Sequence, residues 1–276
     1  MAEVQGYQAV LLHTMWSQKE VEKVLGKGAT YITILRDPVD QFESLYSYSH
    51  FETKLHLDIE GFVKTYVDQD REMPRMNGYL GRNQQLWDLS LMDTVHLDLV
   101  EAKVEEVDNN FHLVMIAEHF EESLVLLSHQ LCWPLANMTS LKLNARKPSQ
   151  KSALSEESRQ KLKSWLSADY LLYDHFAKKL KDKMVTFGKE RLAKEVAELR
   201  KLNLEVEERC VVEEVKDTGK LSENFRPWSK DVVGFRVSSE AEDCQHFAKT
   251  EVWILRQSLK SFAQNFLFLR FTSSRR

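Results

Sequence analysis

The chain has 276 residues, of which 43% are hydrophobic and 29% are charged, a composition typical of a globular protein with a sizeable buried core. Its formal charge of −4, without a basic stripe interleaved with aromatic residues, gives no reason to expect nucleic acid as a partner. The opening MAEVQGYQAVLLHTMW does not have the pattern of a signal peptide, and no window approaches 18 apolar residues. We therefore expect neither a leader nor a membrane anchor in this sequence.

The first part of the chain alternates apolar strand patterns with helical patterns. A short apolar run at Tyr7–His13 predicts a strand, and Gln18–Leu25 predicts a helix that stops at a glycine. Ala29–Leu35 is β-branched and apolar with almost no alternation, which is typical of a parallel strand buried on both faces. A helix is expected to follow as far as Tyr48. Further helical patterns cover Ile59–Gln69, Asn83–Leu91 and Leu97–Asp108.

A second buried strand is predicted at Leu113–Ala117, directly followed by the helical pattern FEESLVLLSHQL. Recurring strand–helix–strand units indicate an α/β fold with a parallel sheet flanked by helices. We expect this α/β core to occupy residues 1–150. Residues 151–276 read as a helical region that packs on the core.

The long helix predicted at Lys189–Arg209 carries one apolar stripe, formed by Leu192, Val196, Leu199, Leu202 and Val206. Packing within its own domain is favoured over a coiled coil, because the heptads do not persist. The Phe- and Leu-rich C-terminal VWILRQSLKSFAQNFLFLRF is interrupted by basic residues. Two readings stay open there, packing on the domain and binding to a membrane surface.

The three cysteines have no metal-ligand spacing, so we expect no metal site. Cys132, within the apolar LSHQLCW, is predicted to be a buried thiol. Cys210 and Cys244 flank a polar stretch and are candidates for a disulfide, although free surface thiols would look the same in sequence. Asn137 begins an Asn-Met-Thr glycosylation sequon.

The stretch ITILRDPVDQFESLYSYSH joins a strand to a helix and carries the most informative polar residues. Asp37 is a good N-cap, and Pro38 suits the first helical position. Val39, Phe42 and Tyr46 share one face and are expected to pack against the sheet. A second face carries Asp37, Gln41, Ser44 and Tyr48, with Ser44 almost two turns beyond the cap.

Arg36 and Ser44 together suggest a phosphate site. A guanidinium binds phosphate through two hydrogen bonds and a hydroxyl adds one more. Arg36 also lies at the carboxyl end of a parallel strand, where ligands of open α/β sheets bind. The alternative is that Arg36 pairs with Asp37 or a helix end and that Ser44 is an ordinary surface residue.

The same stretch resembles the second nucleotide-binding motif of sulfotransferases, which holds the 3′-phosphate of 3′-phosphoadenosine 5′-phosphosulfate. With FHLVMIAEHFEESLVLLSHQLCW, LKLNARK and FGKERLAKEVAELR, it is similar to the galactose-3-O-sulfotransferase family from about Leu12 to Asn203. The resemblance implies a P-loop-like sulfotransferase fold. It also implies sulfuryl transfer to the galactose 3-hydroxyl of galactosylceramide or related glycolipids and glycans, without a metal, in the Golgi lumen or at its membrane.

The family resemblance assigns roles to individual residues. Arg36 and Ser44 would bind the 3′-phosphate, and Asn144 and Arg146 in LKLNARK match a loop near the nucleotide. His13 matches a family histidine near the acceptor and is our candidate general base, since neutral imidazole accepts a proton near pH 7. His50 is the second choice.

The sequence departs from the family pattern at its beginning. The family carries an earlier strand and a lysine-containing loop that cradles the 5′-phosphosulfate, and these 276 residues have no counterpart of that motif. We therefore expect the chain by itself to be loosely packed or poorly soluble. Two other interpretations remain, a catalytically inactive relative that binds a partner or glycan and, less well supported, a kinase-like nucleotide binder. A homo-oligomer is also left open.

Overall fold

The computed structural model describes residues 14–92, 96–143, 145, 154–227, 229, 232–250 and 253. The strand predicted at Tyr7–His13 and the apolar C-terminal segment beyond Trp253 lie outside these residues. The chain groups into two compact units, residues 1–138 with 152–197 and residues 139–151 with 198–276. Two helices that we expected in a separate C-terminal region, α8 (Glu156–Trp165) and α9 (Ser167–Phe187), therefore group with the parallel strands.

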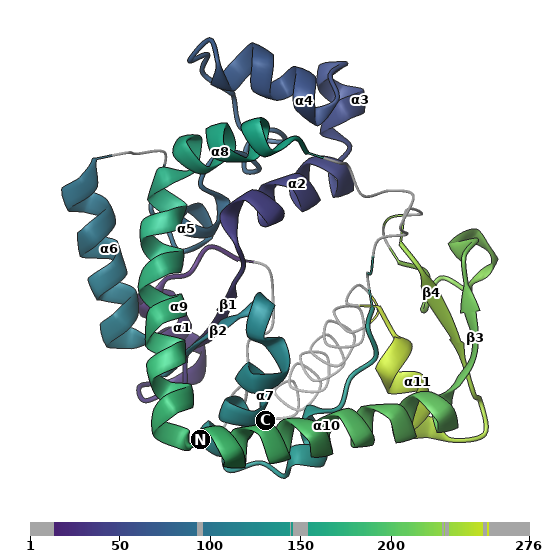
Figure 1. Ribbon diagram of the computed structural model, residues 1–276. Coiled ribbons are helices and arrows are strands. Elements are labelled where there is room, and N and C mark those ends of the chain that lie inside the picture. Colours follow the sequence, from purple (N-terminus) through teal and green to yellow (C-terminus); the bar gives the residue numbers. More distant parts are fainter. Residues whose placement is uncertain are drawn as a thin grey trace, which may run out of the picture. The chain divides into compact units, whose positions relative to one another are not determined.

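The first unit contains a parallel pair of strands, β1 (Ile32–Leu35) and β2 (Leu113–Ile116), in the register Ile32 to Leu113 and Leu35 to Ile116. This confirms the predicted α/β class and the parallel pairing. Figure 1 shows the pair beside α9, and both α9 and α7 contact β2. The remaining elements are α1 (Gln18–Leu25), α2 (Pro38–Tyr48), α3 (Phe51–Leu55), α4 (Ile59–Phe62), a π-helical turn (Val63–Val67), α5 (Gln84–Asp88), α6 (Leu97–Asn110), α7 (Phe120–Gln130) and short 3₁₀ turns at Ala117–His119 and Leu135–Met138.

The burial of β1 differs from the prediction. β2 is buried along its whole length, as expected, but the Ile34 side chain of β1 is 46% exposed. β1 is also shorter than predicted, since its pairing with β2 begins at Ile32, a few residues after Gly26 and Gly28, both at positive φ. Among the described residues β1 has a single neighbouring strand. One edge of β1 is therefore hydrogen-bonded to β2, while its face around Ile34 is left open to solvent.

The apolar face of α2 is buried as predicted, but it does not pack against the sheet. Val39, Phe42 and Tyr46 belong to a cluster built by α3, α4 and α8, in which no β1 or β2 residue takes part. The Phe42 ring lies 5.2 Å from the Trp165 ring and 5.4 Å from the Phe62 ring, centroid to centroid. α2 thus leaves the sheet edge and is anchored by aromatic packing against helices distant in sequence.

The second unit includes α10 (Lys189–Cys210) from residue 198 onward and an antiparallel pair, β3 (Val211–Val215) and β4 (Gly234–Val237). Short strands here correct the expectation of a wholly helical C-terminal region. They were missed because β3 is only five residues long and carries two glutamates. A 3₁₀ turn (Thr218–Lys220) and α11 (Glu242–Ala248) complete the unit. α10 itself is the predicted long helix, and Leu192, Val196, Leu199 and Val206 of its stripe are buried.

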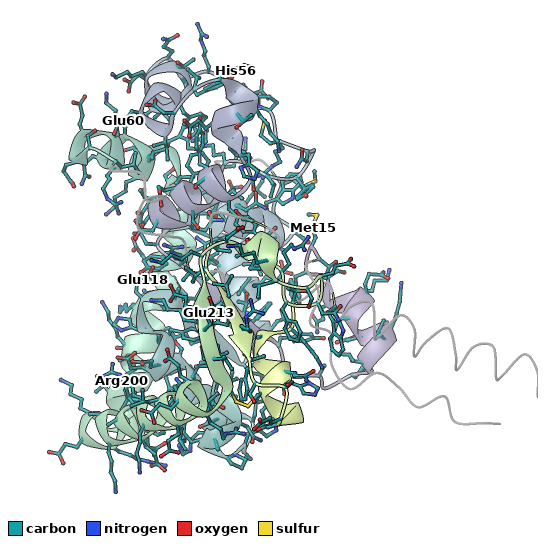
Figure 2. The ribbon with its side chains drawn as sticks, turned by 90° about the vertical axis from the view of Figure 1, so that its right-hand side faces the viewer. Met15, His56, Glu60, Glu118, Arg200 and Glu213 are labelled. Atoms are coloured by element: carbon teal, nitrogen blue, oxygen red, sulfur yellow. A yellow bond between two sulfur atoms is a disulfide. The ribbon has the colours of Figure 1, made fainter. Side chains whose placement is uncertain are left out.

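A disulfide joins Cys210 at the end of α10 to Cys244 in α11, with Cα atoms 5.0 Å apart (Figure 2). Both cysteines are fully buried and pack with Val206. Cys132, by contrast, is an exposed free thiol, so the prediction of burial was wrong. The reason is local, because α7 ends at Gln130 and Cys132 lies in the following turn at a φ of 52°, off the apolar face of the helix.

Within the described part of the chain, no helix is both long enough and apolar enough to cross a membrane. The same residues contain no group of three or more histidine, cysteine, aspartate or glutamate side chains arranged to hold a metal ion.

Candidate active site at the carboxyl end of the parallel strands

The β1–α2 junction places Arg36 and Asp37 at the carboxyl end of β1. Asp37 caps α2 as predicted, since its Oδ1 accepts hydrogen bonds from the backbone N–H groups of Val39 and Asp40, both at 3.0 Å. Pro38 occupies the first turn. The cap uses the N–H groups that a helix N-terminus would otherwise offer to an anion. Phosphate binding at this junction would therefore depend on side chains.

Asp37 is also occupied on its second oxygen. Its Oδ2 accepts a hydrogen bond of 2.8 Å from the Tyr170 hydroxyl of α9. Burial and this hydrogen bond raise the pKa of Tyr170, so the hydroxyl keeps its proton and remains a donor. The carboxylate is thus satisfied by neutral donors, without a pairing to Arg36.

Glu118 follows β2 in the same way as Asp37 follows β1. Its Oε1 accepts a hydrogen bond of 2.9 Å from the Asp37 backbone N–H, which links the ends of the two strands. Its Oε2 accepts a hydrogen bond of 3.1 Å from the Tyr173 hydroxyl, one turn along α9 from Tyr170. Figure 2 labels Glu118. Burial and the charge of Glu118 raise the pKa of Tyr173, so this donor also keeps its proton.

Arg36 and Ser44 are left with free donor groups. Both residues are half-buried, and in the part of the chain that the structure describes neither the Arg36 guanidinium nor the Ser44 hydroxyl makes a hydrogen bond or ion pair. The alternative in which Arg36 pairs with Asp37 is therefore not what the structure contains. A half-buried, unpaired guanidinium at a strand's carboxyl end is suited to a phosphate ligand.

The other predicted site residues either lie outside the described part of the chain or are exposed away from Arg36. His13, Asn144 and Arg146 lie outside the described residues. His50 is exposed in a left-handed conformation beyond the end of α2, so a helix about 16 Å long separates it from Arg36. Asn137 is exposed in the 3₁₀ turn Leu135–Met138.

No sequence pattern pointed to Gln85, Tyr170 or Tyr173, which lie 49 to 133 residues from their hydrogen-bond partners. Asp169 had a recognisable signal. It lies on the same helix face as Leu172, Phe176 and Leu180, all buried, so it is an acid on an apolar stripe. Asp169 is fully buried and its Oδ1 and Oδ2 accept hydrogen bonds from the backbone N–H groups of α5.

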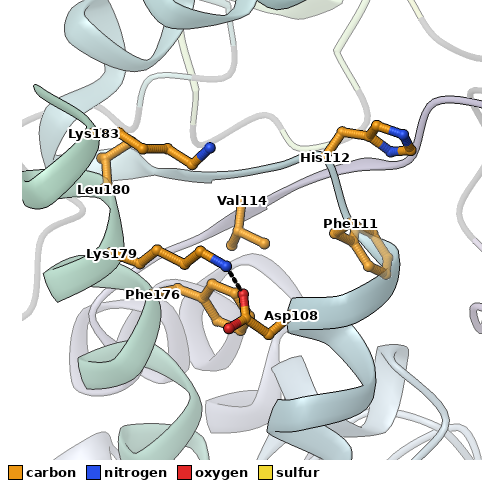
Figure 3. A pocket seen from close by; sticks show the side chains of 8 residues that line it. All are labelled: Asp108, Phe111, His112, Val114, Phe176, Lys179, Leu180 and Lys183. Carbon is orange, nitrogen blue, oxygen red and sulfur yellow. Dashed lines mark hydrogen bonds and ion pairs between the residues drawn. The ribbon is translucent and has the colours of Figure 1, made fainter. Parts of the chain in front are cut away.

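A small cavity lies at the opposite, amino end of β2 (Figure 3). It measures about 120 Å³ and is lined by Asp108, Phe111, His112, Val114, Phe176, Lys179, Leu180 and Lys183. The Asp108 carboxylate there is bound by Lys179 and His175. A cavity of this size is too small for a nucleotide.

Comparison with known proteins decides the family. A family model described as galactose-3-O-sulfotransferase matches residues 2–259, which is most of the chain. The chain belongs to the galactose-3-O-sulfotransferase family. This confirms the resemblance read from the sequence.

The individual proteins that this chain resembles are also sulfotransferases. Galactosylceramide sulfotransferase of Mus musculus is 32% identical over 251 residues, which cover 84% of this chain and 58% of the relative. The Bos taurus protein of the same name is 30% identical, covering 90% and 63%. Galactose-3-O-sulfotransferase 2 of Sus scrofa is 29% identical, covering 95% and 69%. The chain thus spans about three fifths of the length of the first two relatives. No solved structure matches it significantly.

Proposed function

We propose that the chain takes part in sulfuryl transfer from 3′-phosphoadenosine 5′-phosphosulfate to the 3-hydroxyl of galactose in a glycolipid or glycan. Family membership supports the reaction class. The single observation that carries the assignment to a site is the unpaired Arg36 guanidinium at the carboxyl end of β1, with the free Ser44 hydroxyl on the helix that follows. The proposal includes a P-loop-like sulfotransferase fold around the β1–β2 pair.

In this scheme Arg36 and Ser44 hold the 3′-phosphate of the donor, and Asn144 and Arg146 contact the nucleotide. The donor supplies an activated sulfuryl group. His13 accepts the proton of the galactose hydroxyl, whose oxygen forms the new bond to sulfur as the bond from sulfur to the 5′-phosphate breaks. Cationic and N–H donors near the leaving phosphate stabilise the charge that develops on it.

The disulfide and the sequon bear on the compartment. A buried disulfide between Cys210 and Cys244 fits an oxidising environment, and an exposed Asn137 is accessible for glycosylation. We therefore propose the Golgi lumen or its membrane as the site of action, with a galactose-containing glycolipid such as galactosylceramide, or a related glycan, as acceptor.

Titration calorimetry with adenosine 3′,5′-bisphosphate tests the site. Arg36→Ala is expected to weaken binding at least a hundred-fold, because two charge-assisted hydrogen bonds to phosphate are lost, and Ser44→Ala about ten-fold. Lys183→Ala, at the amino end of β2, is the control and should change nothing. Equal binding by Arg36→Ala and the unaltered chain would overturn the site.

A second measurement separates a working enzyme from an inactive relative. Transfer of labelled sulfate to galactosylceramide, compared with a galactose-terminated glycan, reports turnover and acceptor class. Nucleotide binding that depends on Arg36, combined with no transfer to either acceptor, would support the binding-only alternative.

A further inference from the structure

The side-chain amide of Gln85 binds both backbone groups of Arg36. The Arg36 N–H donates to Gln85 Oε1 at 2.8 Å, and Gln85 Nε2 donates to the Arg36 carbonyl oxygen at 3.0 Å. A peptide group of a neighbouring strand would offer the same donor and acceptor. Since the β1–β2 register ends at Leu35 and Ile116, the amide extends the hydrogen bonding of β1 by one residue.

Gln85 is itself held in place by buried groups. Only 8% of its surface is exposed, and it lies in α5, a helix of five residues. Asp169, with no exposed surface, accepts hydrogen bonds from the backbone N–H groups of Gln85 at 3.2 Å and Leu86 at 2.9 Å. A carboxylate that accepts the first N–H groups of a helix stabilises its N-terminus. α5 is therefore fixed to α9, and Gln85 is fixed to Arg36.

We propose that Gln85, supported by Asp169, is a positioning residue that fixes the backbone of Arg36 so that its guanidinium meets the 3′-phosphate. This inference rests on the proposed function of Arg36. A side chain leaves its backbone in a direction set by φ and ψ, and Arg36 lies just beyond the regular part of β1. Without the amide, the residue keeps its charge but loses its fixed direction, and part of the binding energy goes to ordering it.

The test is a double-mutant cycle with adenosine 3′,5′-bisphosphate on the full chain. Gln85→Met, similar in shape but unable to form these hydrogen bonds, is expected to weaken binding about ten-fold. In an Arg36→Ala background the same change should cost nothing further, because its effect passes through Arg36. An equal loss in both backgrounds would overturn the inference.

Gln84→Met is the matched control. Gln84 lies in the same helix, is 5% exposed, and binds the Gly81 N–H, Arg75 and Asp88, with no hydrogen bond to Arg36. Its replacement should lower thermal stability and leave nucleotide affinity within two-fold. An equal affinity loss from Gln84→Met would show that Gln85 acts through general stability of α5.

Gln85→Glu gives a second readout that a purely structural role would not produce. A protonated glutamic acid keeps both the donor and the acceptor, whereas the carboxylate keeps only the acceptor and places a negative charge near the site. Affinity relative to the unaltered chain should recover as the pH falls from 8 to 5.5. A ratio that is constant with pH would contradict the positioning role.

Hydrogen exchange separates failure of this inference from failure of the proposed function. Gln85→Met should speed exchange of the Arg36 amide proton at least ten-fold without any ligand present, and Gln84→Met should not. Unchanged exchange would overturn the positioning role. Accelerated exchange together with nucleotide binding that is insensitive to Arg36→Ala would overturn only the proposed function, together with the ligand assigned here.

Discussion

At the carboxyl end of β1 and β2 the acids Asp37 and Glu118 accept hydrogen bonds from tyrosine hydroxyls and backbone N–H groups, whereas at the amino end Asp108 is bound by Lys179 and His175. The charged Lys179 neutralises the acid at the amino end. Neutral donors satisfy the acids at the other and leave the cation of Arg36 unpaired. The difference teaches that an acid next to an arginine in the sequence need not pair with it, provided that uncharged donors occupy the carboxylate.

Replacing Asp169 is expected to change the free energy of unfolding most, because its carboxylate binds the N-terminus of α5, the helix that carries Gln85. Burial raises its pKa to about 7 from 3.8, despite the N–H groups of Leu86 and Gln85. An acid whose pKa is higher in the folded state stabilises folding most at low pH, and this stability falls as the pH rises from about 4 to 7. The fall should reach about 2 to 4 kcal/mol.

Asp169→Asn cannot titrate and should remove this component of the pH dependence. Urea denaturation of both proteins at pH 5 and pH 8 measures it, and contributions of the other acids cancel in the difference. Parallel stability curves for the two proteins would show that Asp169 does not titrate in this range.

Tyr170→Phe comes next and tests the role of neutral donors directly. Removing the hydroxyl frees Asp37 Oδ2 and should cost about 1 kcal/mol of stability. The freed carboxylate then competes for Arg36, so affinity for adenosine 3′,5′-bisphosphate should fall about three-fold, and further at low salt. Tyr66→Phe is the control, since this hydroxyl has no hydrogen bond within the described residues. An unchanged affinity in Tyr170→Phe would show that the Tyr170 hydroxyl is not what keeps Asp37 from pairing with Arg36.

Asp108→Asn should have the smallest effect. Burial raises the pKa of Asp108, but the hydrogen bonds from Lys179 and His175 outweigh it and leave the pKa below its usual value. The pair is partly exposed, so the change should cost less than about 1 kcal/mol at pH 7. That cost should be constant above pH 4 and disappear as the pH falls through the folded pKa. Thermal melts measure this stability cost. A loss of nucleotide affinity in Asp108→Asn would show that the amino end of the β1–β2 pair also affects the nucleotide site.

Much of the local structure could be predicted from the sequence. The α1 bounds, the Asp37 cap of α2, the parallel pairing of the two apolar strands and the long α10 were all readable, because each depends on residues close in sequence or on a simple periodicity. Family membership was equally accessible, since the motif around Arg36 is contiguous. Short or charged strands such as β3 were not, because a five-residue pattern carries little signal.

What the sequence by itself determined is therefore the class of fold, the family and the position of Arg36 between the end of β1 and the start of α2. Tertiary structure alone decided that α2 packs on helices, that Ile34 is exposed, and that Tyr170 satisfies Asp37 while Gln85 holds the Arg36 backbone. The physical reason is distance along the chain. Local propensities are set within a turn or a strand, but which donor reaches which acceptor across 49 or 133 residues is fixed only when the helices pack.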